Sequence, residues 1–302
     1  MFLPITHEYF PHSRFQTPII FTPSSFPILP SEVSSSSPLV KIVKVQRRRS
    51  HPRKSPTSLS QLGSTRGFKI CHLNIQSFIP KLDEFKILLA QSKAHVMAIS
   101  EPWLTPYIPD SFLSIENYEL YRKDRISKIG GGVAFYVNRK YAHLISKIET
   151  ETETLKLIVH FTPQHAITII VTYKPPNVSE SSYLSQLTDI IKSITTKELV
   201  ILGDINLDWN DSSSKSLKNI AIKLGLCQLI KDPTRIGKTR SSILNLFLTN
   251  QPSKYAMSGV MDVAISDHSL IYAVRTILKS KKNSCFSLCT KNTNFKTVAI
   301  QC

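Results

Sequence analysis

Short apolar runs alternate with helical stretches between Phe68 and Ile277, and this order restricts the possible folds more than any other feature of the chain. Runs with strand character occur at 68–75, 94–104, 130–138, 154–161, 166–176, 198–206, 242–250 and 269–277. Apolar residues at helical spacing occur at 79–93, 181–195 and 212–226. Because several strands follow one another without a helix, the pattern favours sheets packed face to face with helices outside over a simple doubly wound sheet. The predicted fold class is therefore α/β, in the form of a layered sandwich.

The segments on either side of this region have a different composition. Residues 1–66 contain nine of the 18 prolines, together with the runs SEVSSSSP and KIVKVQRRRSHPRK. Such a segment buries too little apolar surface to offset the entropy lost on ordering. We therefore predict a disordered basic tail over 1–66, a folded domain over 67–278 and a second basic tail over 279–302. The basic run is typical of a nuclear address or a non-specific nucleic-acid contact, and a solvated tail without function is the plainer alternative.

The charge of the chain indicates its partners. The formal net charge is +17, and the excess is spread over both tails and the central region. A basic surface favours nucleic acid or an acidic membrane face, but no window reaches the roughly 18 apolar residues of a membrane helix. The charge alone does not identify the polyanion, and many basic proteins bind neither specifically. We expect no membrane association and no obligate protein partner. The five cysteines form no CxxC pair, so we expect reduced thiols in an intracellular protein. The basic run favours a nuclear location. A mitochondrial presequence stays open, because the first residues are poor in acid and rich in serine.

Side chains capable of chemistry recur at the ends of the predicted strands. They are Asn74, Glu101, Tyr173, Asp204 and Asn206 after strands, and Asp267 and His268 just before the last one. Residues two apart in a strand point to the same face, so Asp204 and Asn206 are expected to face one spot. Carboxylates and amides suit a hard divalent cation such as Mg²⁺, and a histidine adds a proton donor or base. Each residue alone has a structural explanation as a turn or cap, but their recurrence favours a shared site.

The order of these motifs resembles that of a known superfamily. The motifs LNIQS, SEPWL, GGGVAFYV, YKPP, GDIN and SDHSL follow one another as in the exonuclease-endonuclease-phosphatase superfamily. More closely, they resemble the apurinic-type endonuclease domain of non-LTR retrotransposons. The resemblance covers about residues 67–276, and SEPWL, GDIN and SDHSL are its specific part. It implies a four-layered α/β sandwich with one active site at the top of its two sheets.

The resemblance also implies a metal site. It places Mg²⁺, with Mn²⁺ as an alternative, on Glu101, with Asn74 close by holding metal or phosphate oxygens. Asp267 would belong to the carboxylates on the metal side.

The catalytic roles follow from the same resemblance. Asp204 would orient and activate the attacking water, while Asn206 and Tyr173 would stabilise the phosphate. His268 would donate a hydrogen bond to the scissile phosphate. The implied function is a Mg²⁺-dependent DNA endonuclease that nicks one strand and leaves a 3′-hydroxyl. The alternatives are a catalytically decayed DNA-binding relic and a phosphatase or phosphodiesterase of the same superfamily.

One position departs from the family pattern. The segment SSILNLFLTN has Asn245 where the family usually carries an aspartate that hydrogen-bonds the histidine corresponding to His268. An amide oxygen still accepts an N–H bond but brings no charge to support a protonated imidazole. We therefore predict a folded, DNA-binding but weakened nuclease.

Overall fold

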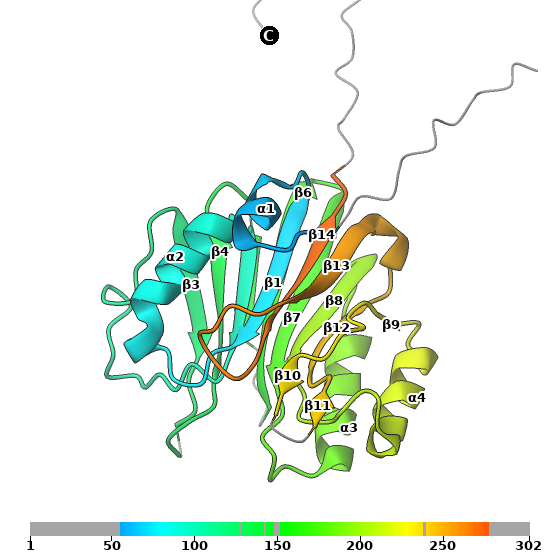
Figure 1. Ribbon diagram of the computed structural model, residues 1–302. Helices are drawn as coiled ribbons and strands as arrows, with labels where there is room; N and C mark the ends of the chain where they lie inside the picture. Colours follow the sequence, from blue (N-terminus) through cyan, green and yellow to red (C-terminus); the bar gives the residue numbers. More distant parts are fainter. Residues whose placement is uncertain (1–54, 127, 142, 148–151, 238–239, 278–302) are drawn as a thin grey trace, which may run out of the picture. The chain divides into compact units, whose positions relative to one another are not determined.

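The computed structural model describes residues 55–126, 128–141, 143–147, 152–237 and 240–277 (Figure 1). The predicted basic run at 41–54 and the predicted tail at 279–302 lie outside the described residues. In the described part, no helix is long and apolar enough to cross a membrane.

Two six-stranded sheets form the framework of the described domain. The first sheet has the order β13 (Tyr255–Met261), β14 (Leu270–Arg275), β1 (Phe68–Asn74), β2 (Val96–Ser100), β4 (Val133–Asn138) and β3 (Tyr118–Lys123). The second has the order β5 (His143–Lys147), β6 (Glu153–Thr162), β7 (His165–Tyr173), β8 (Glu198–Asp204), β12 (Asn245–Thr249) and β9 (Cys227–Gln228). A small hairpin joins β10 (Arg235–Ile236) and β11 (Ser241–Ser242).

Each sheet contains a parallel pair connected through a helix. In the first sheet β1 and β2 are parallel neighbours, and α2 (Leu82–Ser92) lies between them in the chain. In the second sheet β7 and β8 are parallel neighbours, with α3 (Glu180–Lys192) between them. The carboxyl ends of the two strands in each pair therefore lie at the same edge of their sheet.

Helices cover the outer faces of the sheets, as Figure 1 shows. The short helix α1 (Leu59–Ser64) and α2 lie on the first sheet, and α3 and α4 (Lys215–Lys223) lie on the second. Helix α2 buries Phe85, Leu88 and Leu89 in one hydrophobic cluster. Helix α3 and the residues between the sheets contribute to a second cluster. The predicted α/β sandwich with packed sheets and outer helices is thus confirmed.

The structure also contains elements that the sequence patterns did not predict. Helix α1 lies inside the segment expected to be a tail, so ordered structure begins before residue 67. Its Leu62 is fully buried, and the hydroxyl of Tyr272 donates a hydrogen bond to the carbonyl oxygen of Pro56. One helical turn with a single buried leucine is too short to produce a periodic signal. Strands β3 and β13 were also missed, because most of their residues are only partly buried.

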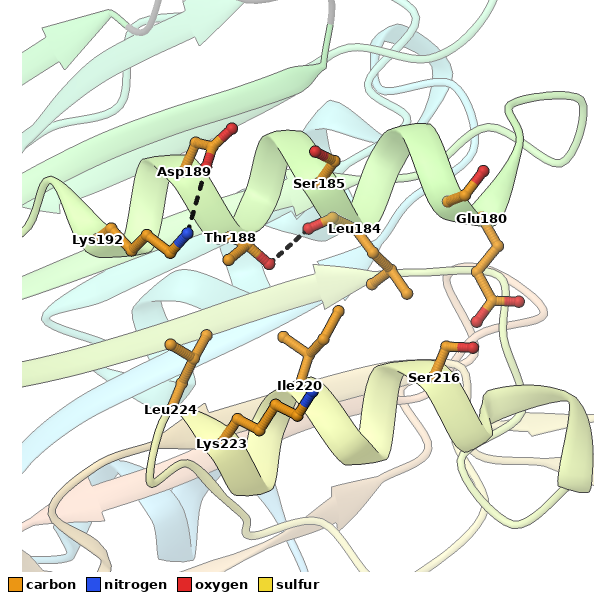
Figure 2. Close-up of a pocket in the computed structure, with 11 residues that line it drawn as sticks. Glu180, Leu184, Ser185, Thr188, Asp189, Lys192, Ser216, Ile220, Lys223 and Leu224 are labelled. Carbon is orange, nitrogen blue, oxygen red and sulfur yellow. Dashed lines mark hydrogen bonds and ion pairs between the residues drawn. The ribbon is translucent and has the colours of Figure 1, made fainter. Parts of the chain in front are cut away.

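A wide groove of the described domain lies between α3 and α4 (Figure 2). It has a volume of about 760 Å³, and its lining includes Leu184, Thr188 and Lys223. The Thr188 hydroxyl donates to the Leu184 carbonyl oxygen within α3, so that polar group is satisfied locally. None of the predicted site residues lines this groove. The predicted site residues lie instead at the strand ends.

Candidate active site

The strand directions bring the predicted residues to one end of the sandwich. Strand β1 ends at Asn74, and Glu101 directly follows β2. Strands β7 and β8 end at Tyr173 and Asp204, which are paired in register. Strand β12 is antiparallel to β8 and begins at Asn245, directly opposite Asp204. His268 precedes β14, which is antiparallel to β1. Residues spread over most of the domain's sequence are therefore gathered in one place.

Asn74 links the two sheets at this end. Its side-chain amide nitrogen donates to Glu101 Oε1 at 2.8 Å and to Asp204 Oδ2 at 2.7 Å. Asn74 is fully buried and Asp204 is almost so. The side-chain nitrogen of Asn74 thus lies within hydrogen-bond distance of both the Glu101 and the Asp204 carboxylates.

The turn after β8 explains the Gly-Asp-x-Asn motif. Asn206 adopts a left-handed backbone conformation with φ 51°, and its backbone N–H donates to Asp204 Oδ1 at 2.9 Å. Its side-chain amide donates to the carbonyl oxygen of Lys174 at 2.9 Å. The motif is both a turn and a means of fixing the carboxylate. Asp204 and Asn206 are in contact, but through the backbone N–H of Asn206 in a turn and not through two side chains on one face of a strand. The side-chain amide of Asn206 is engaged with backbone.

Burial raises the pKa of Asp204, and the neighbouring Glu101 acts in the same direction. His268 and the hydrogen bonds from Asn206 and Asn74 oppose this shift, but the net direction is upward. A carboxylate with a raised pKa accepts a proton more readily than an exposed aspartate does. Asp204 therefore has the environment of a general base.

His268 is buried between an amide and the carboxylate of Asp204. Its Nδ1 lies 3.2 Å from Asn245 Oδ1, and its Nε2 lies 3.7 Å from Asp204 Oδ2. The Asn245 amide nitrogen in turn donates to the Ser269 carbonyl oxygen at 3.4 Å. The amide of Asn245 is thereby oriented with its oxygen toward the imidazole. The predicted contact between Asn245 and His268 is present, but Asn245 brings no negative charge to it.

Asp267 lies at the rim of the group. Its side chain is 40% exposed, and Arg235 Nη2 contacts its Oδ2 at 2.7 Å. His268 Nε2 is 3.9 Å from its other oxygen. Asp267 is thus near the histidine but already paired with an arginine of β10. Its place among the metal-side carboxylates stays a prediction.

Tyr173 is buried beside Glu101. Burial raises the pKa of its hydroxyl, and the nearby Glu101 carboxylate raises it further. The phenol therefore stays protonated and keeps a hydrogen to donate. A pocket of about 390 Å³ opens next to Tyr173 and is also lined by Arg125 and Glu153.

The donor set suits a partly hydrated Mg²⁺. Among the residues that the structure describes, no three His, Cys, Asp or Glu side chains form a group able to hold a metal. Mg²⁺ commonly uses one or two carboxylates and completes its shell with water and phosphate oxygens. Glu101, next to the Asn74 amide and the Asp204 carboxylate, offers such a partial set of oxygen ligands.

Sequence reasoning missed three residues that shape the site. Trp103 donates its indole N–H to Glu101 Oε2 at 3.2 Å, Arg235 pairs with Asp267, and Glu153 contacts the loop beside Glu101. Trp103 lies in the SEPWL motif, so the sequence alone could have indicated it. The other two lie far from any motif in the chain, and only the fold brings them near.

Comparisons with known proteins bear on the fold. A family model described as endonuclease-reverse transcriptase matches residues 167–272, the segment from β7 to β14. The match covers about a third of the chain and agrees with the endonuclease/exonuclease/phosphatase resemblance of its motifs. The resemblance predicted from the motifs is thereby confirmed. No curated protein matches the chain by sequence.

Solved structures of two endonucleases and a phosphatase share the fold. The endonuclease domain of TRAS1, a telomere-specific non-LTR retrotransposon, is 18% identical with a TM-score of 0.60, over 70% of this chain and 100% of that one. The AP endonuclease LMAP from Leishmania major is 12% identical with a TM-score of 0.61, over 70% and 89%. A variant of the 3′ phosphatase NExo from Neisseria, bound to product DNA hairpin, is 14% identical with a TM-score of 0.58, over 70% and 100%. At these identities the likeness establishes the fold.

Proposed function

We propose that the protein is a Mg²⁺-dependent DNA endonuclease of the non-LTR retrotransposon type, which nicks one strand and leaves a 3′-hydroxyl. The observation that carries the proposal is the single contact group of Asn74, Glu101, Asp204 and His268 at one end of the sandwich. It contains a carboxylate for a metal, a buried carboxylate suited to act as a base, and an imidazole. The endonuclease-reverse transcriptase family match supports the choice of branch.

Each residue has a part in phosphodiester hydrolysis that its position supports. Glu101 holds the metal, assisted by Asn74, and the bound Mg²⁺ supplies neutralisation of charge on the phosphate oxygens. Asp204 orients the attacking water and takes its proton, which its burial favours. His268, through Nε2, donates to the phosphate, while Asn206 and Tyr173 hold phosphate oxygens.

Of the proposed roles, the hydrogen bond from His268 Nε2 to the phosphate has the least support from its surroundings. When Nδ1 donates its hydrogen to Asn245 Oδ1, Nε2 carries a hydrogen only in the protonated imidazole. Asp204, 3.7 Å away, supports that positive charge, whereas Asn245 does not. The proposed enzyme is therefore active below the level of a site with aspartate at position 245.

DNA is the proposed partner. The net charge of +17 suits a polyanion, and the NExo structure was determined with a DNA hairpin. The relatives named above include a 3′ phosphatase, so removal of a terminal phosphate is the second candidate reaction.

The deciding experiment compares two substrates with the full-length protein. Supercoiled plasmid, with and without Mg²⁺, measures nicking, and a 3′-phosphorylated duplex measures phosphate release. We expect Mg²⁺-dependent conversion of supercoiled plasmid to the open circle, with 3′-hydroxyl ends. Phosphate release without nicking would favour the phosphatase. DNA binding without either reaction would identify a decayed relic.

A further inference from the structure

The three consecutive glycines before β4 have a backbone conformation that other residues rarely adopt. Gly130, Gly131 and Gly132 have φ angles of +93°, +71° and +85°. A Cβ atom on Gly131 would lie 2.2 Å from the guanidinium of Arg125, and one on Gly132 would lie 3.2 Å from the Lys123 carbonyl oxygen. Glycine is favoured there because of these positive φ angles.

The carbonyl groups of this glycine segment hold the segment that contains the proposed metal ligand. Gly132 O accepts from the Glu101 backbone N–H at 3.1 Å, and Gly131 O accepts from the Trp103 backbone N–H at 3.1 Å. Glu101 and Trp103 have φ angles of 54° and 53°, in the left-handed region. Residues in this region persist only where their surroundings enforce them. The glycine segment is part of what enforces the conformation of Glu101.

The glycine segment is itself fixed from the other sheet. Glu153, the first residue of β6, accepts a hydrogen bond from the Gly132 backbone N–H through Oε2. Its Oε1 accepts from Arg125 Nε at 2.5 Å. The side chain of Glu153 is only 11% exposed, so this charge depends on its two partners. A carboxylate of the second sheet thus fixes a loop of the first sheet.

Glu153 and Arg125 also lie close to Tyr173. Glu153 lies opposite Tyr173 in the register of β6 and β7, and the Arg125 guanidinium carbon is 5.8 Å from the centre of the Tyr173 ring. Arg125 and Glu153 therefore lie close to both the glycine segment and Tyr173.

We propose that Glu153, together with Arg125, is a positioning residue for the metal ligand Glu101, acting through Gly132. This inference rests on the proposed function for the role of Glu101 as a metal ligand. Removal of the Glu153 carboxylate leaves the Gly132 N–H without its acceptor and Arg125 without its counter-charge. The glycine segment then relaxes, and Glu101 and Trp103 lose their fixed orientation, while both sheets keep their cores.

Trp103 serves as a reporter of this orientation. It is 40% exposed and hydrogen-bonded to Glu101, and replacing the other tryptophan by Trp209→Phe leaves it as the sole indole of the full chain. In this background we compare Glu153→Ala, Glu153→Gln and the matched control Glu119→Ala. Glu119 is a partly exposed acid of β3 that contacts Tyr121 and His143. The acrylamide quenching constant of Trp103, measured without metal, reports the orientation of the segment that contains Glu101 and Trp103. The Mn²⁺ concentration that gives half of the change in Trp103 fluorescence, the Mn²⁺ midpoint, reports metal binding by Glu101.

We expect Glu153→Ala to raise the acrylamide quenching constant of Trp103 about twofold and the Mn²⁺ midpoint at least about tenfold. Glu119→Ala should change neither. Glu153→Gln keeps an acceptor for Gly132 but loses the charge, so its Mn²⁺ midpoint should rise about threefold. If Glu153→Ala does not fold, Glu153→Gln carries the test, and a midpoint equal to that of the parent overturns the inference.

Two outcomes separate this inference from the proposed function. Unchanged quenching and an unchanged Mn²⁺ midpoint in folded Glu153→Ala would overturn the positioning role, even if the parent binds Mn²⁺ and nicks DNA. Increased quenching in Glu153→Ala, with no Mn²⁺ response in the parent, would support the positioning of Glu101 and contradict its role as a metal ligand.

Discussion

Asn245 is the residue at which this chain departs most clearly from the pattern of the superfamily that its motifs resemble. Its oxygen faces His268 Nδ1, and its nitrogen donates to the Ser269 carbonyl oxygen. A carboxylate at this position would strengthen the support for a protonated His268. It would also lose the bond to Ser269 and place a second charge beside buried Asp204.

The variant Asn245→Asp should therefore nick plasmid faster than the parent. We expect an increase of at least about tenfold, equivalent to about 1.4 kcal/mol of barrier. The measurement is the nicking rate at one Mg²⁺ concentration and one pH, with thermal unfolding as a check on the fold. Equal rates in two folded and measurably active proteins would contradict the assigned role of this contact.

Among the elements, β8 and β14 are joined at the end away from the proposed site by a buried ion pair. Glu198 at the start of β8 accepts from Arg275 Nε at 2.7 Å and from Lys254 Nζ at 2.8 Å. Burial alone would raise the pKa of Glu198, but the hydrogen bonds from Arg275 and Lys254 outweigh it and lower the pKa. The pair thus contributes stability above the pKa of an unfolded glutamate, about 4.3. That contribution is lost as the pH falls through the lower folded value.

Glu198→Gln should lower the free energy of unfolding by about 3 kcal/mol at pH 7, because it leaves Arg275 without its carboxylate. The difference between variant and parent should begin to shrink below about pH 4.3, where the glutamate of the unfolded chain takes up a proton, and should shrink further as the pH falls through the lower folded pKa of Glu198. Urea unfolding at several pH values measures this effect. A difference that is constant from pH 7 to pH 3 would show that the ionised carboxylate is not its source.

The elements predicted from sequence are strands with a continuous apolar run and helices with apolar residues at helical spacing. Buried strands such as β1 and β8 were recognised, and their polar ends marked Asn74 and Asp204. The partly buried β3 has no continuous apolar run, and α1 is too short to show a helical spacing of apolar residues. Glu153 could not be assigned to the site from sequence, because its contacts with Gly132 and Arg125 depend on how the two sheets pack.

For the whole molecule, the proposed DNA binding is mainly electrostatic. Each phosphate contact by Lys or Arg releases counterions, so log affinity should fall with log salt at a slope of about −0.9 per contact. Titrations of a labelled duplex between low and moderate salt measure the slope. An affinity that does not depend on salt would exclude this mode of binding.

Two deletions separate the basic tail from the folded domain. Removing residues 1–54 should weaken DNA binding and leave the thermal transition unchanged, because the run KIVKVQRRRSHPRK is lost but α1 is kept. Removing residues 1–66 should also lower the transition temperature, because buried Leu62 is lost. Equal transition temperatures for the two deletions would contradict a structural role of α1. Nuclear location stays a prediction from the same basic run.

The central claim, that Glu101 holds a metal used in DNA nicking, is tested most directly by Glu101→Ala. Its matched control is Glu84→Ala, which removes an exposed acid from the first turn of α2. The measurement is the Mg²⁺-stimulated rate of plasmid nicking in folded protein. We predict that Glu101→Ala loses this stimulation while Glu84→Ala and the parent nick at the same rate. Nicking by Glu101→Ala at the rate of the parent would contradict the assignment of the site.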